Sequence, residues 1–359
     1  MSSERSSTEP STEPYAGPHA GPYAGPYAGP HAGPAAGPAA GSAAGPAAGP
    51  AAGPAAGRSA APAGFLGRVR SRLPWQDAAV VVLQGGLGNQ LFQWALGTEL
   101  VARGQPVVYD RARLRGDRPL AIGPLLAGEP QVPKPLGLGL AALDRVGQLD
   151  RVPGLSTVRQ DGFGFDPRAL RARSGAYLLG FWQSPRFFPS VPGEVRRRVR
   201  EFATAALTPA GRALLDRLQA DPGSIAVHVR RGDYVANARA RGFHGVLGVD
   251  DYYGPALTLL ADRGYGRRYL FSDDLEWAAA HLARPDDVVV GRDVATAAVG
   301  EVGLMAACGA RAIANSTFSW WAGWLADDRP DSTTVAPHRW FVAPGQDAGD
   351  LLPDGWLRC

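Results

Sequence analysis

Two adjacent arginines follow a run of apolar residues in the second half of the chain. The sequence from residue 225 to 233 reads IAVHVRRGD, so the apolar run leads directly into Arg230 and Arg231. The run predicts a buried strand, and open α/β sheets bind ligands at the carboxyl ends of their strands. The planar guanidinium of arginine matches the oxygens of a phosphate group. The segment therefore indicates a phosphate-bearing ligand, with a solvated turn after an ordinary strand as the alternative.

A glycine-rich turn follows another apolar run, with the sequence GGLGNQLFQ over residues 85–93. Gly86 and Gly88 match the first two glycines of a dinucleotide-binding fingerprint, but Leu91 stands where the third glycine belongs. The sequence contains no Gly-Lys-Ser/Thr, which excludes a P-loop. We interpret the segment as a tight strand-to-helix turn whose bare backbone lets a substrate come close. Asn89 at the helix start is either an N-cap or a substrate ligand.

Two further segments combine a predicted strand end with polar side chains. Residues 315–324 read NSTFSWWAGW and begin a helix after an apolar strand, and the free N–H groups of a helix start attract anions. The tryptophans of this segment have helical spacing, which predicts core packing. In FSDD, residues 271–274, Asp273 is placed to accept hydrogen bonds from a nucleoside, whereas Asp274 fits a helix N-cap.

Composition and charge exclude several classes of protein. No segment approaches the ~20 apolar residues that span a bilayer, and no basic run interleaved with aromatic residues indicates nucleic-acid binding. The net charge is +4 and the cations are nearly all arginines, which suits an anionic substrate but is also typical of a GC-rich genome. No Asp-x-Asp is present to hold a divalent ion on a diphosphate, so we expect no metal. Cys308 and Cys359 are expected to be a buried small side chain and a free thiol.

Taken in their order along the chain, these segments resemble the motifs of the α1,2-fucosyltransferases, enzymes that use GDP-fucose. The pattern His-x-Arg-Arg-x-Asp at 228–233 resembles the central motif of that family. Residues 85–93 resemble its N-terminal motif, residues 315–324 its C-terminal motif, and GFWQS at 180–184 an element of its bacterial members. The resemblance covers about residues 78 to 345.

The resemblance implies an inverting transfer of L-fucose from GDP-β-L-fucose to the 2-hydroxyl of a galactosyl acceptor, without a metal or other cofactor. The galactose would belong to an oligosaccharide or a lipid-linked acceptor in the synthesis of a surface glycan. Another nucleotide sugar on the same fold, or a non-catalytic glycan-binding protein, are the alternatives. The sequence does not indicate an oligomeric state, and no residue stands out as a general base.

The resemblance also implies roles for individual residues. Arg230 would contact the β-phosphate and act in catalysis together with Asn89. Arg231 and Asp233 would pair with each other and hold the loop. The residues expected to bind the donor are His228, Arg230, Asp273, Ser316, Thr317 and Phe318, and the candidates on the acceptor side are Gln90, Trp182 and Gln183.

Alternating strand and helix patterns must position these residues, and they predict parallel sheets covered by helices. We expect an α/β protein of the GT-B-like type that the resemblance implies, with two Rossmann-like halves facing a cleft. The expected strands are at 78–83, 106–109, 177–181, 224–230, 268–272, 287–290 and 310–314, and the expected helices at 89–103, 251–263, 275–283, 295–308 and 316–326.

The expected organisation is a disordered Ala/Gly/Pro tail at 1–57, a linker at 58–76, an acceptor-side half at 77–200, a GDP-sugar-binding half at 201–345 and a C-terminal extension at 346–359. The protein is expected to be cytoplasmic. Residues 65–75 mix arginine with bulky apolar side chains, which suits either a short linker or peripheral contact with the inner face of a membrane.

Overall fold

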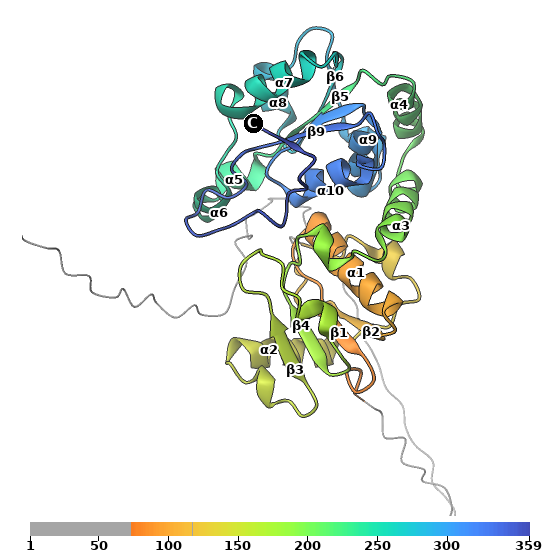
Figure 1. Cartoon of the computed structure of the whole chain (residues 1–359), viewed down its shortest axis with the longest axis vertical. Coiled ribbons are helices and arrows are strands. Elements are labelled where there is room, and N and C mark those ends of the chain that lie inside the picture. The colour runs from red at the N-terminus through yellow and green to blue at the C-terminus, as the bar shows by residue number, and fades with distance from the viewer. Residues whose placement is uncertain (1–72, 117) are drawn as a thin grey trace, which may run out of the picture.

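The computed structural model describes residues 73–116 and 118–359, so the tail expected at 1–57 and most of the linker lie outside the described residues. The described chain is an α/β protein with two parallel sheets. The sheet of the N-terminal half lies in the lower part of Figure 1, and that of the C-terminal half lies in the upper part. The predicted architecture of two Rossmann-like halves is confirmed.

The sheet of the N-terminal half has the order β2-β1-β4-β3. Its strands are β1 (Ala79–Val82), β2 (Val107–Asp110), β3 (Ser156–Arg159) and β4 (Ala176–Leu179). Strand β1 is apolar at every position because helices cover both faces of the sheet. Ala79 and Val81 pack in one core with α1 (Leu87–Ala102), while Val80 and Val82 pack in another with Leu140 of α2 (Lys134–Arg145).

The sheet of the C-terminal half has the order β10-β9-β8-β5-β6-β7. Its strands are β5 (Ile225–Val229), β6 (Arg268–Ser272), β7 (Val288–Val289), β8 (Ala310–Ala312), β9 (Thr333–Ala336) and β10 (Leu357–Arg358). Strand β10 pairs with β9, with Leu357 opposite Val335. Residues 357–358, within the segment expected as a C-terminal extension, therefore form the edge of this sheet. An edge strand of two residues leaves no periodic pattern in the sequence.

Of the helices described in the C-terminal half, the sequence predicted the last four, two of them with different bounds, and did not predict the first three. In chain order, the helices are α4 (Pro209–Gln219), α5 (Gly232–Ala236), α6 (Ala238–His244), α7 (Gly254–Ala261), α8 (Leu275–His281), α9 (Val299–Ala307) and α10 (Thr317–Ala326). The helix predicted over 251–263 is divided into a π-helical turn (Val249–Tyr253) and α7, since Pro255 lacks the N–H needed to continue the first. Helix α9 begins later than predicted because the backbone of Ala295 is extended, and the amide of Thr296 bonds to Ala206.

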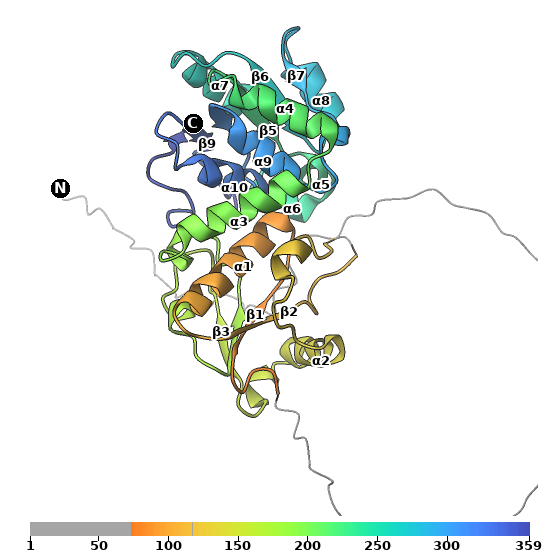
Figure 2. The same ribbon diagram turned by 90° about the vertical axis from the view of Figure 1, so that its right-hand side faces the viewer.

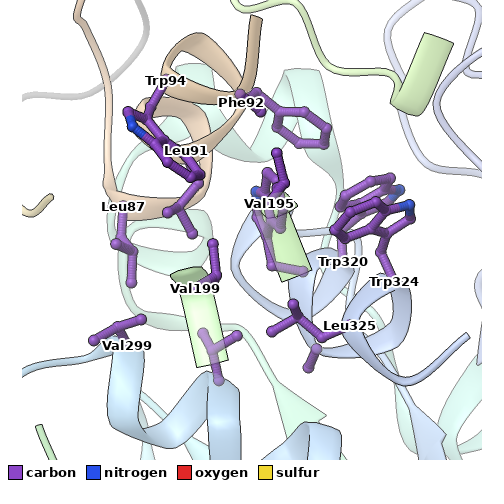
Figure 3. Close-up of a cluster of buried hydrophobic side chains, with 14 of the residues drawn as sticks. Leu87, Leu91, Phe92, Trp94, Val195, Val199, Val299, Trp320, Trp324 and Leu325 are labelled. Atoms are coloured by element: carbon purple, nitrogen blue, oxygen red, sulfur yellow. The ribbon is translucent and has the colours of Figure 1, made fainter. Parts of the chain in front are cut away.

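Helices α1, α3 (Pro192–Ala205) and α10 join the two halves through a continuous apolar core. Figure 2 shows α3 along this junction, beside α1. Side chains of all three helices meet in Figure 3, with Val195 and Val199 of α3 between Leu91 and Trp320. The ring centroids of Phe92 and Trp320 are 4.4 Å apart. The predicted core role of the tryptophans at 320, 321 and 324 is confirmed, because all three are buried.

Two other sequence expectations can be compared with the described part of the chain. Both cysteines are free, and Cys308 is buried, as predicted. Within residues 73–116 and 118–359, no helix combines the length and the apolar character that crossing a bilayer requires.

Candidate active site

A cavity of about 710 Å³ is lined by residues of both halves. This volume lies in the range of about 300–1,000 Å³ that is typical of small-molecule sites. Because all strands of each sheet are parallel, their carboxyl ends meet at one edge, and segments that follow these ends line the cavity. Those of the N-terminal half include Gly86, Arg118, Phe163 and Phe181, and those of the C-terminal half include Arg230, Asp273, Arg292, Asn315 and Phe341.

Two helices from opposite halves begin at this cavity. A Cβ on Gly88, in the first turn of α1, would lie 2.6 Å from the carbonyl carbon and the hydroxyl of Thr317, the first residue of α10. Only glycine allows this approach, and the indole N–H of Trp321 fixes it by donating to the Gly88 carbonyl at 2.9 Å. Helix N-termini carry a partial positive charge, so their meeting here suits an anionic ligand.

The caps of these helices agree only in part with the sequence predictions. Ser316 caps α10, and its hydroxyl accepts a hydrogen bond from the Phe318 amide. Asn89 does not cap α1, contrary to one interpretation, because the helix begins two residues earlier, after Gly86. The Asn89 side chain instead accepts a hydrogen bond from Gln183 at 2.8 Å, and both residues line the cavity.

Arg230 lines the cavity and is held by two carboxylates. Its Nη1 lies 2.8 Å from Asp273 Oδ2, and its Nη2 lies 2.6 Å from Asp233 Oδ1. The second oxygen of Asp233 accepts from Arg118 of the N-terminal half at 3.0 Å. Asp233 therefore orients one arginine from each half toward the same cavity. Arg118 was not predicted from the sequence, because it stands in a loop without a recognisable motif.

Arg231 and Asp233 do not pair with each other, contrary to the prediction. The side chain of Arg231 contacts Asp274 at 3.3 Å and lies over the ring of Trp277 at 4.0 Å. Successive residues at the end of a strand point to opposite sides, so the two arginines cannot share one site. Asp274 accepts from the Trp277 amide at 3.1 Å and caps α8, as predicted.

His228 lies in the cavity wall, with its ring 5.3 Å from that of Phe318. Burial lowers the pKa of His228 far below its ordinary value, and the charge of Arg230 adds to this effect while Asp273 opposes it. The imidazole is therefore neutral near pH 7. Its buried Nδ1 has no hydrogen-bond partner among the described residues.

Glu301 and Arg292 line the cavity beyond β7 and were missed by sequence analysis. Burial raises the pKa of Glu301, and the charge of Arg292 counteracts the rise. Glu301 stands in the first turn of α9, whose other residues are all apolar or glycine. An isolated acid in such a helix was the one signal that could have identified it.

Two residues predicted on the acceptor side do not line the cavity. Gln90 is fully buried, and its carboxamide braces the surrounding loops by donating to the carbonyls of Gly85 and Pro119 and accepting from the Ala121 amide. Trp182 is also fully buried, and its ring packs against Phe187 at 5.4 Å. A Trp182 backbone with φ of 55° turns its side chain into the core, and the flanking residues Phe181 and Gln183 line the cavity in its place.

Four phenylalanines line the remaining end of the cavity, and we call them the phenylalanine cluster. They are Phe163 and Phe181 from the N-terminal half, and Phe243 and Phe341 from the C-terminal half. No sequence pattern connects them, because each stands in a loop or a short helix. Within the part of the chain that the structure describes, no group of three His, Cys, Asp or Glu side chains is arranged to hold a metal ion.

Comparisons with known proteins identify the class of this site. Residues 165–357, more than half of the chain, match Glycosyl transferase family 11. The chain is 30% identical over 297 residues to the alpha-1,2-colitosyltransferase of Escherichia coli, covering 78% of this chain and 98% of that protein. It is 38% identical over 136 residues to the O-antigen biosynthesis glycosyltransferase WbnK of Escherichia coli, covering 37% of this chain and 44% of that protein.

The fold and the site are thus those of a glycosyltransferase. The chain belongs to glycosyl transferase family 11.

Solved structures show a more distant likeness. The NodZ alpha-1,6-fucosyltransferase soaked with GDP-fucose aligns at 16% identity and a TM-score of 0.33, covering 70% of this chain and 92% of that one. POFUT1 in complex with GDP aligns at 12% identity and a TM-score of 0.32, covering 73% of this chain and 99% of that one. At these TM-scores the likeness carries no argument about the site.

Proposed function

We propose that this glycosyltransferase moves L-fucose from GDP-β-L-fucose to the 2-hydroxyl of a galactosyl acceptor, with inversion at the anomeric carbon and an α1,2 linkage in the product. The observation that carries the proposal is Arg230, held by two carboxylates in a cavity where two helices begin. The relative WbnK, named for O-antigen biosynthesis, supports a role in the synthesis of a surface glycan.

The centre of the cavity suits the diphosphate of the donor. Arg230 and Arg118 both line it, and the N-termini of α1 and α10 meet there. A diphosphate that binds Arg230 would share or displace the carboxylates that now hold its guanidinium. As the bond between the anomeric carbon and the β-phosphate oxygen breaks, negative charge develops on GDP, and fixed donors in such a site stabilise it without a metal ion.

Glu301 suits the guanine base. Guanine presents an N–H and an amino group side by side, and a carboxylate with two oxygens can accept from both. These donors would favour the charged form of Glu301, whose pKa burial raises in their absence. We expect Glu301→Gln to raise the Kd for GDP by at least ~10-fold, since one lost charge-assisted hydrogen bond costs about 1.5–3 kcal/mol. Isothermal titration with GDP and with UDP would measure this loss.

The acceptor hydroxyl attacks the face of the sugar opposite GDP. A bond forms between its oxygen and the anomeric carbon, the electron pair of the broken bond leaves with GDP, and the proton of the hydroxyl passes to water. Asn89 and Gln183, paired at 2.8 Å, are placed to hold this hydroxyl. Among the described residues that line the cavity, the acids are Asp273 and Glu301, and neither is assigned as the base because Arg230 holds the first and guanine would occupy the second.

A second donor, GDP-colitose, is favoured by the 30% identity to the alpha-1,2-colitosyltransferase. Colitose is L-fucose without its 3-hydroxyl, so both sugars would bind the same diphosphate site. The test is a panel of GDP-fucose, GDP-colitose, GDP-mannose and UDP-galactose with a β-galactoside, in which released nucleotide is measured and the linkage is assigned by NMR. Turnover of GDP-fucose to an α1,2 product supports the proposal. Turnover of GDP-colitose alone shows that GDP-colitose, and not GDP-fucose, is the donor. Preference for the UDP-sugar, or no turnover at all, overturns it.

A further inference from the structure

We propose that the phenylalanine cluster is the acceptor subsite and that it binds the galactose ring by stacking against the ring's C–H face. This inference rests on the proposed function and names the residues that choose its acceptor.

The strand order of the C-terminal half places the cluster at the end of the cavity away from the base. Strand β5, which leads to Arg230, lies between β6 on one side and β8 on the other. Asp273 follows β6, and Arg292, whose charge acts on Glu301, follows β7, whereas Phe341 follows β9 on the other side of β5. With the diphosphate at Arg230 and guanine toward Glu301, the transferred sugar and the acceptor must lie toward Phe341.

The strand order of the N-terminal half gives the same direction independently. Arg118 follows β2 at one edge of that sheet, while Phe181 and Phe163 follow β4 and β3 at the other edge. Arg118 contacts Asp233 of the C-terminal half, and Phe163 contacts Phe341 of that half. Both sheets therefore place Arg118 and Asp273 on one side of the cavity and the phenylalanine cluster on the other.

The four rings form a chain of contacts that crosses from half to half. The centroid of Phe163 is 4.4 Å from that of Phe341 and 5.9 Å from that of Phe243. Phe163 and Phe181 are nearly parallel, with 8° between their planes and 6.2 Å between their centroids. Each of the four contributes to the cavity lining, so part of the cluster is open to a ligand rather than closed into the core.

A galactose ring matches this surface. Its axial 4-hydroxyl leaves the hydrogens on C3, C4 and C5 together on one face, and these weakly positive hydrogens pack against the negative face of an aromatic ring. The adjoining polar groups are the amides of Asn89 and Gln183, which suit the hydroxyls on the ring edge. The nearest imidazole, His244, has its pKa lowered to about 4 by burial, so it is neutral at pH 7 and suits an uncharged sugar.

The alternative is that the cluster only packs the two halves together. In that case, a loss of ring surface would lower stability and weaken the binding of donor and acceptor equally. An acceptor subsite predicts that only acceptor binding is weakened, and the experiment distinguishes these two results.

The test compares Phe163→Leu and Phe341→Leu with Phe165→Leu, a matched control whose ring packs on Phe187 and does not line the cavity. Kinetics are measured with a β-galactoside and with the corresponding β-glucoside, whose equatorial 4-hydroxyl interrupts the C–H face. We expect both cluster variants to raise the KM for the galactoside at least 10-fold and to reduce the preference for it over the glucoside. The Kd for GDP should stay within 2-fold, and Phe341→Tyr, which keeps the ring, should stay near wild type.

An unchanged KM for the galactoside in folded cluster variants overturns the inference, as does a Kd for GDP that rises in parallel with the KM. An equal effect of Phe165→Leu on the KM also overturns it. Failure of the proposed function is recognised separately, because the wild-type protein would then neither bind GDP nor turn over a GDP-sugar.

Discussion

Arg230→Lys tests the proposed diphosphate site because it keeps the positive charge and removes the planar guanidinium with its paired N–H donors. The guanidinium contacts Asp233 at 2.6 Å and Asp273 at 2.8 Å through different nitrogens. A lysine ends in a single ammonium, which cannot span two carboxylates and present paired donors to a phosphate at the same time. The position of the ammonium would be set by one carboxylate alone. Its positive charge would therefore not be fixed beside the phosphate oxygen on which the leaving GDP develops negative charge.

The expected loss can be scaled from other sites of this kind. Removing one fixed donor from a site that stabilises a developing anion costs about 2.7–4 kcal/mol in transition-state free energy. Each ~1.36 kcal/mol is a tenfold change in rate, so kcat should fall by ~100-fold or more. Arg231→Lys is the matched control, since Arg231 contacts Asp274 and Trp277 outside the cavity. We expect that variant to lose less than ~5-fold.

The assay is GDP release from the GDP-sugar that the donor panel selects, at saturating galactoside. Circular dichroism and thermal unfolding would establish that both variants are folded. If folded Arg230→Lys keeps kcat within about threefold of wild type, Arg230 does not stabilise the leaving group. An equal loss in Arg231→Lys would refute the different roles that the structure gives to the two arginines.

Three further predictions address the junction of the halves, the buried histidines and the absence of a metal. Gly88→Ala places a methyl group 2.6 Å from Thr317, so urea unfolding should show a free energy of unfolding lower by about 1–3 kcal/mol. Gly139→Ala, with open space around it, should be neutral or stabilising. Equal stability of Gly88→Ala and wild type would contradict this prediction. Burial lowers the pKa of His244 from 6.5 to about 4, so the unfolded chain binds more protons between these pH values and stability should fall as the pH drops through them. His244→Gln should therefore flatten the pH dependence of Tm over this window, and the same change at the exposed His281 should not. Activity should survive excess EDTA, and a complete loss restored by magnesium or manganese would overturn the metal-free leaving-group argument.

The features that could be predicted from the sequence are those in which neighbouring residues carry the signal. Parallel strands are covered on both faces, so β1 and β5 read as unbroken apolar runs, and the polar residues just after them mark the edge of a sheet. Arg230, the N-terminus of α10 and the cap at Asp274 follow from such local patterns. The resemblance to a transferase family depended on the same short segments.

The direction of each side chain and the assembly of the cavity depended on tertiary structure. Asn89 and Gln90 are neighbours in α1, but a helix turns by about 100° per residue, so one lines the cavity and the other braces a loop. In the same way, Arg230 and Arg231 leave the end of one strand on opposite sides.

Arg118, Glu301 and the phenylalanine cluster stand in loops or at helix starts, where no periodicity marks a residue's role. They meet because parallel strands in two facing sheets bring segments distant in sequence to a single edge. The sequence alone determined the strands that are unbroken apolar runs, the class of fold and the arginine that follows one of these strands. Only the packing of one half against the other decided which side chains surround that arginine, because contacts between distant segments leave no local pattern in the chain.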